Sequence, residues 1–196
     1  SCGVGFLGGC CGTTPDHIKA LKESLQGVRP ARRPSHPASA LSSCRKALSI
    51  ENDKPLLIVG ERINPTGKPT LQEELRRGLT TTIERLGRDQ EEQDADLLDV
   101  NVGAPGVDQP AMMVSALKAL SRATTLPLVI DSPDPATIEA GLRLYPGRAL
   151  INSISGESSR METLLSLAAR YGAMFIVLPL TEGGVPKNAG ERRDII

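Results

Sequence analysis

Short runs of mainly apolar residues alternate with amphipathic stretches through residues 55–196, and this alternation predicts most of the secondary structure. Five of these runs have the length of buried strands. They lie at residues 56–59, 97–102, 126–131, 149–152 and 174–178. Between them, apolar residues recur every three or four positions, as on one face of a helix. We therefore expect helices at about 70–86, 112–123, 134–145 and 159–171, and a further one from residue 185.

This strand–helix alternation predicts an α/β fold with a parallel sheet covered by helices. The unit repeats about every 25–35 residues, as in a (β/α)8 barrel of the TIM type. A complete barrel has eight strands and about 250 residues, whereas residues 55–196 contain five predicted strands. The pattern leaves two alternatives, an open doubly wound sheet and an incomplete barrel with about five of the eight strands.

The first 54 residues differ in character and predict two further segments. Residues 1–27 predict a strand, a glycine turn and a helix that begins at Pro15, with Thr14 as its N-cap. Residues 28–54 contain several prolines and arginines and no aromatic residue, which is typical of an extended linker rather than a nucleic-acid surface. We therefore expect a short N-terminal unit at 1–27, a linker at 28–54 and a β/α domain at 55–196.

The composition gives no indication of a nucleic-acid or membrane partner. The formal net charge is zero, which gives no electrostatic reason to expect nucleic acid or an anionic membrane. No apolar run approaches the roughly 20 residues that span a bilayer. The chain begins without Met and without a leader sequence, so we expect it to start inside a longer protein.

Four cysteines in 196 residues do not make a disulfide scaffold. Two of them, Cys10 and Cys11, are adjacent, and neighbouring side chains diverge too much for an unstrained mutual disulfide. We therefore expect a reducing cytoplasm as the compartment, where a cysteine pair favours a metal or catalytic role.

Acidic and amide residues stand at the ends of the first four predicted strands. They are Glu61, Asp99 with Asn101, Asp131, and Asn152. Any one of them could equally be a helix cap or a turn residue, but the same pattern on four successive strands favours a shared role. In a β/α barrel the carboxyl ends of the strands form the active-site rim. A rim of this composition suits a neutral heterocycle with many donors and acceptors, whereas phosphate would need Lys, Arg or helix N-termini.

The motifs at these strand ends resemble those of the pterin-binding domain of methyltetrahydrofolate methyltransferases, a TIM barrel related to dihydropteroate synthase. The similar segments are Gly60-Glu61-Arg62-Ile63-Asn64-Pro65-Thr66-Gly67, Leu98-Asp99-Val100-Asn101, Asp131-Ser132 and Asn152-Ser153-Ile154-Ser155. The resemblance implies that Asp131 pairs with the pterin amino group and the adjacent ring nitrogen, that Asn152 binds another edge of the ring, and that Glu61 lines the pocket. Asp99 and Asn101 would bind the ring or organise the rim. The groups that polarise N5 of the folate would come from strands after residue 196.

The segment Gly8-Gly9-Cys10-Cys11-Gly12-Thr13-Thr14-Pro15 resembles the terminal motif of homocysteine S-methyltransferases. In that family both cysteines bind zinc together with a third cysteine upstream. The resemblance therefore implies that Cys10 and Cys11 are zinc ligands. Zinc leaves one position open and deprotonates a coordinating thiol, which is the state in which homocysteine is nucleophilic.

Together the two resemblances imply a member of the cobalamin-dependent methionine synthases. The implied activity moves a methyl group from 5-methyltetrahydrofolate via cobalamin to homocysteine, giving methionine and tetrahydrofolate, with cobalamin on a further domain or a separate protein. For this chain alone we expect an inactive fragment, because each implied site lacks partners beyond a chain end. The alternatives are a methyltetrahydrofolate:corrinoid-protein methyltransferase, against which the cysteine motif argues, and a non-catalytic truncated product.

Overall fold

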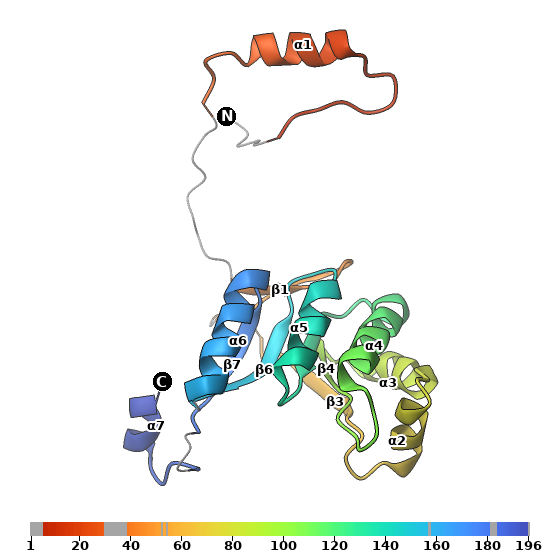
Figure 1. Ribbon diagram of the computed structural model, residues 1–196, viewed down its shortest axis with the longest axis vertical. Helices are drawn as coiled ribbons and strands as arrows, with labels where there is room; N and C mark the ends of the chain where they lie inside the picture. The colour runs from red at the N-terminus through yellow and green to blue at the C-terminus, as the bar shows by residue number, and fades with distance from the viewer. Residues whose placement is uncertain are drawn as a thin grey trace. The chain divides into compact units, whose positions relative to one another are not determined.

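The computed structural model describes residues 6–29, 39–51, 53, 55–156, 158–180 and 184–195 (Figure 1). The chain divides into two compact units, Ser1–Ala38 and Ser39–Ile196. Each unit is described by itself. In the described part of the chain, no helix is long and apolar enough to cross a membrane.

The first unit contains one described helix, α1 (Pro15–Ser24). Thr14 is its N-cap and Pro15 occupies the first turn, as the sequence predicts. The backbone N–H of Thr14 donates to Nδ1 of His17 at 3.1 Å, which ties the start of the helix to its first turn. The predicted strand before the glycine turn does not appear at Phe6 or Leu7, which lie in coil, and the rest of it falls outside the described residues.

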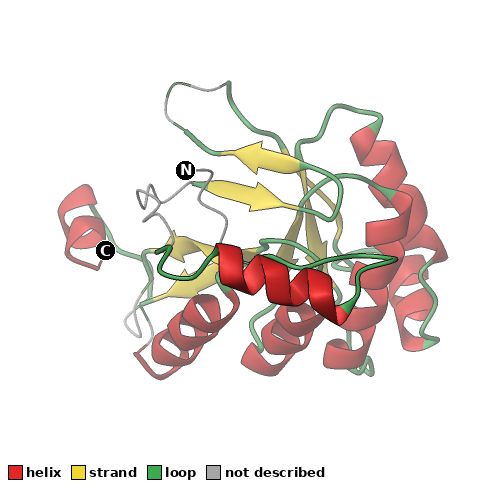
Figure 2. Cartoon of the chain, turned by 90° about the horizontal axis from the view of Figure 1, so that it is seen from above, coloured by secondary structure: helices red, strands yellow, loops and turns green. Residues whose placement is uncertain are grey.

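The second unit is built on a parallel sheet in which each strand pairs with the next strand of the sequence. The strands are β3 (Val59–Ile63), β4 (Leu97–Asn101), β5 (Leu128–Asp131), β6 (Leu150–Ser155) and β7 (Met174–Leu178). The helices are α2 (Pro69–Arg76), α3 (Thr81–Glu91), α4 (Gln109–Ala123), α5 (Pro135–Leu144), α6 (Ser158–Tyr171) and α7 (Ala189–Ile195). Since β/α crossovers are right-handed, strands in sequential order place their helices on one face of the sheet. Figures 1 and 2 show α3 to α6 side by side along that face, whereas α7 lies apart from them.

This arrangement confirms the α/β fold of TIM-barrel type and excludes the doubly wound alternative. The sheet is open, because β3 and β7 are its two edges. Alternate strand residues divide between two apolar clusters. The outer cluster lies under the helices and contains Leu98, Val100, Ile130 and Ile151. The inner cluster contains Leu97, Val129 and Leu150 together with Leu41.

Leu41 comes from a β-hairpin that the sequence does not predict. Its strands, β1 (Ala40–Ser42) and β2 (Ala47–Ser49), pair antiparallel within the expected linker at 28–54. The backbone N–H of Ser42 donates to the carbonyl of Arg148 at 3.1 Å, and Oγ of Ser43 donates to the carbonyl of Thr125 at 2.6 Å. Residues 39–51 therefore belong to the second folded unit, and the expectation that all of 28–54 is an extended linker is wrong for this part.

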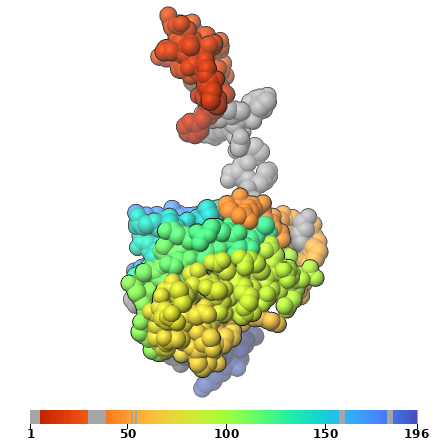
Figure 3. Space-filling view, turned by 90° about the vertical axis from the view of Figure 1, so that its right-hand side faces the viewer, coloured from red at the N-terminus to blue at the C-terminus, as the bar shows by residue number. Residues whose placement is uncertain are grey.

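A second difference lies in the predicted helix at about 70–86, which is two helices. Gly78 has φ +68°, a left-handed conformation that ends α2. Leu79 is 40% exposed, although its spacing from the buried Leu71 and Leu75 continues the apolar face of a helix. The carboxylate of Glu74 then accepts hydrogen bonds from the backbone N–H and Oγ1 of Thr82, which fixes the corner where α3 begins. The two helices form the surface coloured yellow to yellow-green in Figure 3.

The first strand of the sheet also lies later than predicted. β3 covers Val59–Ile63 rather than 56–59, and Leu56 is 91% exposed. Gly60 allows this placement, because a Cβ there would lie 2.7 Å from Oε1 of Gln90. That oxygen instead accepts the backbone N–H of Arg62 at 2.8 Å. As a result Glu61 lies within the strand and not beyond its end.

Candidate functional site

The inner face of the sheet changes from apolar to polar along its strands. In the register of the sheet, Asn101 pairs with Asp131, and Asp131 pairs with Asn152. Asp99 precedes Asn101 by two positions and shares its face. The apolar side chains of the inner cluster lie at and below the level of Asp99, because Asp99 pairs with Val129. The acid and amide residues therefore form a polar layer at the carboxyl ends of the strands, on an apolar floor.

Two hydrogen bonds join these residues across neighbouring strands. Nδ2 of Asn101 donates to Oδ2 of Asp131 at 2.7 Å, and Oδ1 of Asn101 accepts the backbone N–H of Gly103 at 2.8 Å. Nδ2 of Asn152 donates to Oδ1 of Asp99 at 3.1 Å. Both amides are therefore held in one orientation by partners on the protein.

The carboxylates of this layer are hard to ionise. Asp99 is 2% exposed, and its Oδ2 has no hydrogen-bond partner among the described residues. Burial raises the pKa of Asp99 to about 6; the hydrogen bond from Asn152 opposes this, and the charges of Asp131 and Glu61 add to it. The pKa of Asp131 is also raised, first by burial and then by Glu61, while Asn101 and Arg160 lower it.

The structure thus brings the predicted rim residues together. Glu61 is exposed on β3, but its charge acts on both Asp99 and Asp131. Asp99, Asn101, Asp131 and Asn152 form the hydrogen-bonded layer beside it. What each of them binds stays a prediction.

Two further residues near the carboxyl ends of β5 and β6 were not predicted as site residues. Arg160 lies in the first turn of α6, donates from Nη2 to the carbonyl of Ser132 at 3.4 Å, and lowers the pKa of Asp131 by its positive charge. Ser155 at the end of β6 is 5% exposed, and its Oγ has no hydrogen-bond partner within the described ranges. A basic residue inside an amphipathic helix gives no strand-end signal, whereas Ser155 does stand at a strand end.

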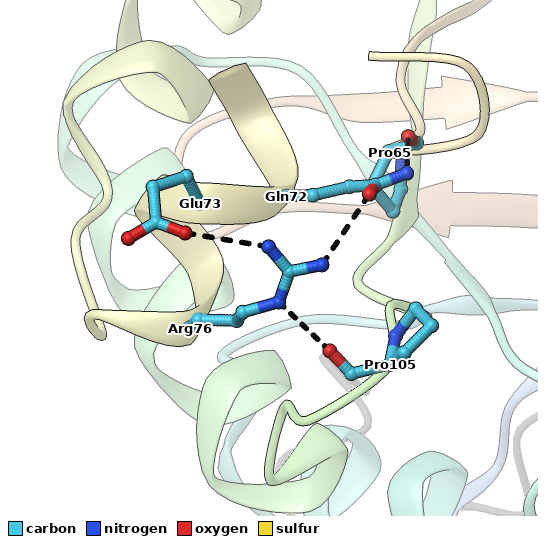
Figure 4. A network of polar contacts seen from close by, with 5 residues as sticks. All are labelled: Pro65, Gln72, Glu73, Arg76 and Pro105. Carbon is cyan, nitrogen blue, oxygen red and sulfur yellow. Dashed lines mark hydrogen bonds and ion pairs between the residues drawn. The ribbon is translucent and has the colours of Figure 1, made fainter. Parts of the chain in front are cut away.

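The loops after β3 and β4 are held together by Arg76 (Figure 4). Its Nε donates to the carbonyl of Pro105 at 2.9 Å, and its Nη2 donates to Oε1 of Gln72 at 3.5 Å. Gln72 in turn donates from Nε2 to the carbonyl of Pro65 at 2.9 Å, while Glu73 pairs with Nη1 of Arg76 at 3.3 Å. A single helix, α2, therefore fixes the positions of two neighbouring rim loops.

The raised pKa of Asp99 predicts how stability depends on pH. The pKa of Asp99 is about 6 in the folded state and about 3.9 in the unfolded state. The buried carboxyl therefore contributes its full stability below about pH 4, where it is protonated, and this contribution is lost as pH rises through 6. We expect Asp99→Asn to remove a pH-dependent cost of roughly 3 kcal/mol. Urea unfolding of both chains at pH 4 and pH 7.5 measures this. A difference between the two chains that is the same at both pH values would contradict it.

In the first unit, Cys10 and Cys11 lie exposed in the loop before α1. Their Sγ atoms are 3.8 Å apart. Two thiolates on a tetrahedral zinc, with Zn–S near 2.3 Å, also lie about 3.8 Å apart, so this pair fits two of the ligand positions. A hydrogen bond from the backbone of Cys11 lowers the pKa of Cys10. Across the described residues, no group of three or more His, Cys, Asp or Glu side chains could hold a metal ion.

The two regions match two family models. Residues 60–195 match the pterin binding enzyme family, and residues 1–25 match the homocysteine S-methyltransferase family. Among curated proteins, methionine synthase of Mycobacterium tuberculosis is 33% identical over 199 residues, and methionine synthase of Mycobacterium leprae is 29% identical over 203 residues. Each alignment covers 98% of this chain and 17% of the relative, so the chain spans about a sixth of the length of these relatives.

Among solved structures, dihydropteroate synthase of Xanthomonas albilineans with 4-aminobenzoic acid superposes with a TM-score of 0.52 at 21% identity. The superposition covers 79% of this chain and 54% of that chain, and it shows a shared fold. The family match is stronger, because its model spans most of the chain and includes all five strands of the parallel sheet but for the first residue of β3. The chain therefore belongs to the pterin binding enzyme family.

Proposed function

We propose that this chain is part of a cobalamin-dependent methionine synthase, which moves a methyl group from 5-methyltetrahydrofolate via cobalamin to homocysteine and gives methionine and tetrahydrofolate. The observation that carries this proposal is the succession, in one chain, of the Cys10–Cys11 motif and the acid–amide layer of a pterin-binding fold. The similarity to two methionine synthases over 98% of the chain supports it.

The polar layer has the chemistry that a pterin ring requires. Asp131 uses Oδ2 for Asn101, and its other oxygen can accept from the 2-amino group or a ring N–H. Asn152 and Glu61 would contact further edges of the ring. Among the described groups that shift the pKa values of Asp99 and Asp131, only Arg160 is positively charged. The layer therefore disfavours an anion such as phosphate.

The methyl group leaves N5 of the folate, and an amine nitrogen leaves poorly unless it is protonated or strongly hydrogen-bonded. We assign no residue of this chain to that role. In the proposed enzyme those groups come from strands that complete the barrel. Cobalamin on another domain or protein would accept the methyl group, and zinc held by Cys10, Cys11 and a third ligand from elsewhere would keep homocysteine as a thiolate.

Each proposed site draws on groups that the described residues do not supply, so we propose that the 196-residue chain alone is inactive. Titration calorimetry with 5-methyltetrahydrofolate tests this. We expect a dissociation constant weaker than about 100 μM for the chain, and a micromolar value for a protein in which the same chain lies within a closed barrel. p-Aminobenzoylglutamate, which carries the folate tail without the pterin, is the control and should not bind to either.

The outcomes separate the parts of the proposal. Micromolar binding by the 196-residue chain would contradict its inactivity but support the pterin site. Failure of the closed-barrel protein to bind would contradict the site itself. Transfer to reduced cobalamin without any transfer to homocysteine would favour the methyltetrahydrofolate:corrinoid-protein methyltransferase, which needs the polar layer but not the cysteine pair.

A further inference from the structure

We infer that Asp99 is a positioning residue that turns the amide of Asn152 so that Oδ1, and not Nδ2, faces the bound ring, and that the site thereby selects a ring edge with an N–H. This inference rests on the proposed pterin site. It assigns to Asp99 a contact with Asn152 in place of a direct contact with the ligand.

The placement of the two residues supports this role. Asp99 lies one level deeper in the sheet than Asn152, because Asp99 pairs with Val129 and Asn152 pairs with Asp131. The strand between them, β5, offers at the level of Asp99 only the buried apolar side chain of Val129. The hydrogen bond from Asn152 therefore passes diagonally over Val129 and reaches Asp99 from above.

Only one orientation of the Asn152 amide is favourable in its contact with Asp99. An ionised carboxylate can accept hydrogen bonds and cannot donate them, whereas an amide can do either. With a pKa of about 6, Asp99 is ionised at pH 7.5, so Nδ2 of Asn152 must face it. A flipped amide would place two acceptors against each other in a buried position, which is costly. The groups that act on this carboxylate are Asn152, Asp131 and Glu61, and none of them supplies a positive charge.

Asn101 differs, because both ends of its amide are used. Its Oδ1 accepts from Gly103 and its Nδ2 donates to Asp131. Asn101 therefore orients Asp131, and both ends of its own amide are already fixed by the protein. Asn152 keeps Oδ1 free of hydrogen bonds from other described residues, so it can accept one from a ligand.

The layer then presents acceptors from both Asp131 and Asn152, and a matching ring must offer N–H groups on two edges. A tetrahydropterin has such groups at the 2-amino side and at N8. A fully oxidised pterin has no hydrogen on N8. We therefore expect preference for the reduced ring, and we expect this preference to depend on Asp99.

Two measurements test the inference, and the first needs no ligand. In the 196-residue chain, the side-chain NH2 resonances of Asn152, identified by their loss in Asn152→Asp, should shift with pH with a midpoint near 6. Asp99→Asn should abolish this titration. The matched control is Asp96→Asn, because Asp96 accepts instead from the backbone N–H of Ile58 and should leave the titration unchanged. Resonances of Asn152 that do not move between pH 4.5 and 8, or that move equally in Asp99→Asn, would overturn the inference.

The second measurement is the ratio of affinities for 5-methyltetrahydrofolate and folic acid in the closed-barrel protein. Asp99→Asn frees the amide of Asn152 to rotate and should lower the ratio by about 10-fold. An unchanged ratio would overturn the inference while the proposed function stands. If the unsubstituted protein binds neither compound, the proposed function fails, and the titration of Asn152 still decides whether Asp99 orients that amide.

Discussion

Replacing Asp131 by Ala is expected to lower kcat/KM for methyl transfer from 5-methyltetrahydrofolate to reduced cobalamin by about 100-fold. A hydrogen bond to a charged group contributes roughly 1.5–3 kcal/mol, and each 1.4 kcal/mol is a factor of ten. The substitution removes the charge-assisted acceptor that the proposed site offers to the ring and also leaves Nδ2 of Asn101 without its partner. Steady-state kinetics of the proposed full-length enzyme would measure the loss.

Two further variants separate charge from shape. Asp131→Asn keeps the shape of the side chain and removes the charge, so its loss should lie between those of wild type and Asp131→Ala. Asp89→Ala is the control, because Asp89 lies on the outer helix α3 in a surface ion pair with Arg85 and should leave kcat/KM unchanged. Unchanged kinetics in both Asp131 variants would remove this residue from the proposed site.

Replacing Leu41 by Ala is expected to lower the free energy of unfolding of the second unit by about 2–5 kcal/mol. Leu41 is 1% exposed and packs in the inner cluster with Leu97, Val129 and Leu150. Shortening it leaves a cavity between the hairpin and the sheet, and the neighbouring side chains can fill such a space only in part. Urea unfolding followed by far-ultraviolet circular dichroism measures the change, since the chain has no Trp to report it by fluorescence.

The matched control is Leu56→Ala, which removes the same atoms from a residue that is 91% exposed. That change should lie within about 0.5 kcal/mol of wild type. If Leu41→Ala and Leu56→Ala unfolded at the same urea concentration, the hairpin would not contribute to the folded unit, and residues 39–51 would behave as the linker that the sequence predicts.

The sequence predicts the β/α order well because a parallel sheet buries both faces of its strands. The predictions for β5 and β7 fall within two residues of the observed strands, although β7 is an edge strand with Phe175 38% and Val177 43% exposed. The hairpin was missed because strands of three residues such as Ala40–Ser42 are too short to show a period. The break between α2 and α3 did have a local signal in Gly78, which the regular spacing of leucines outweighed.

For the candidate site, the sequence predicts which residues form the polar layer but not which of them hydrogen-bond to one another. The carboxyl ends of parallel strands meet at one edge whatever the register, so Asp99, Asp131 and Asn152 could be grouped from their positions alone. The bond between Asn101 and Asp131 joins residues 30 apart, and that between Asp99 and Asn152 joins residues 53 apart. Which amide faces which carboxylate depends on the register of neighbouring strands, and a single sequence does not contain it.

We expect the hairpin to affect the chemistry of the polar layer as well. Leu41 packs in the same inner cluster as Val129, and Val129 pairs with Asp99 in the register of the sheet. Burial is the largest cause of the raised pKa of Asp99, so we expect Leu41 to contribute to it by keeping water out of the apolar floor. A segment that the sequence predicts to be a linker would thus help to exclude water from the site. Loosening the hairpin would let the pKa of Asp99 fall towards that of an ordinary aspartate.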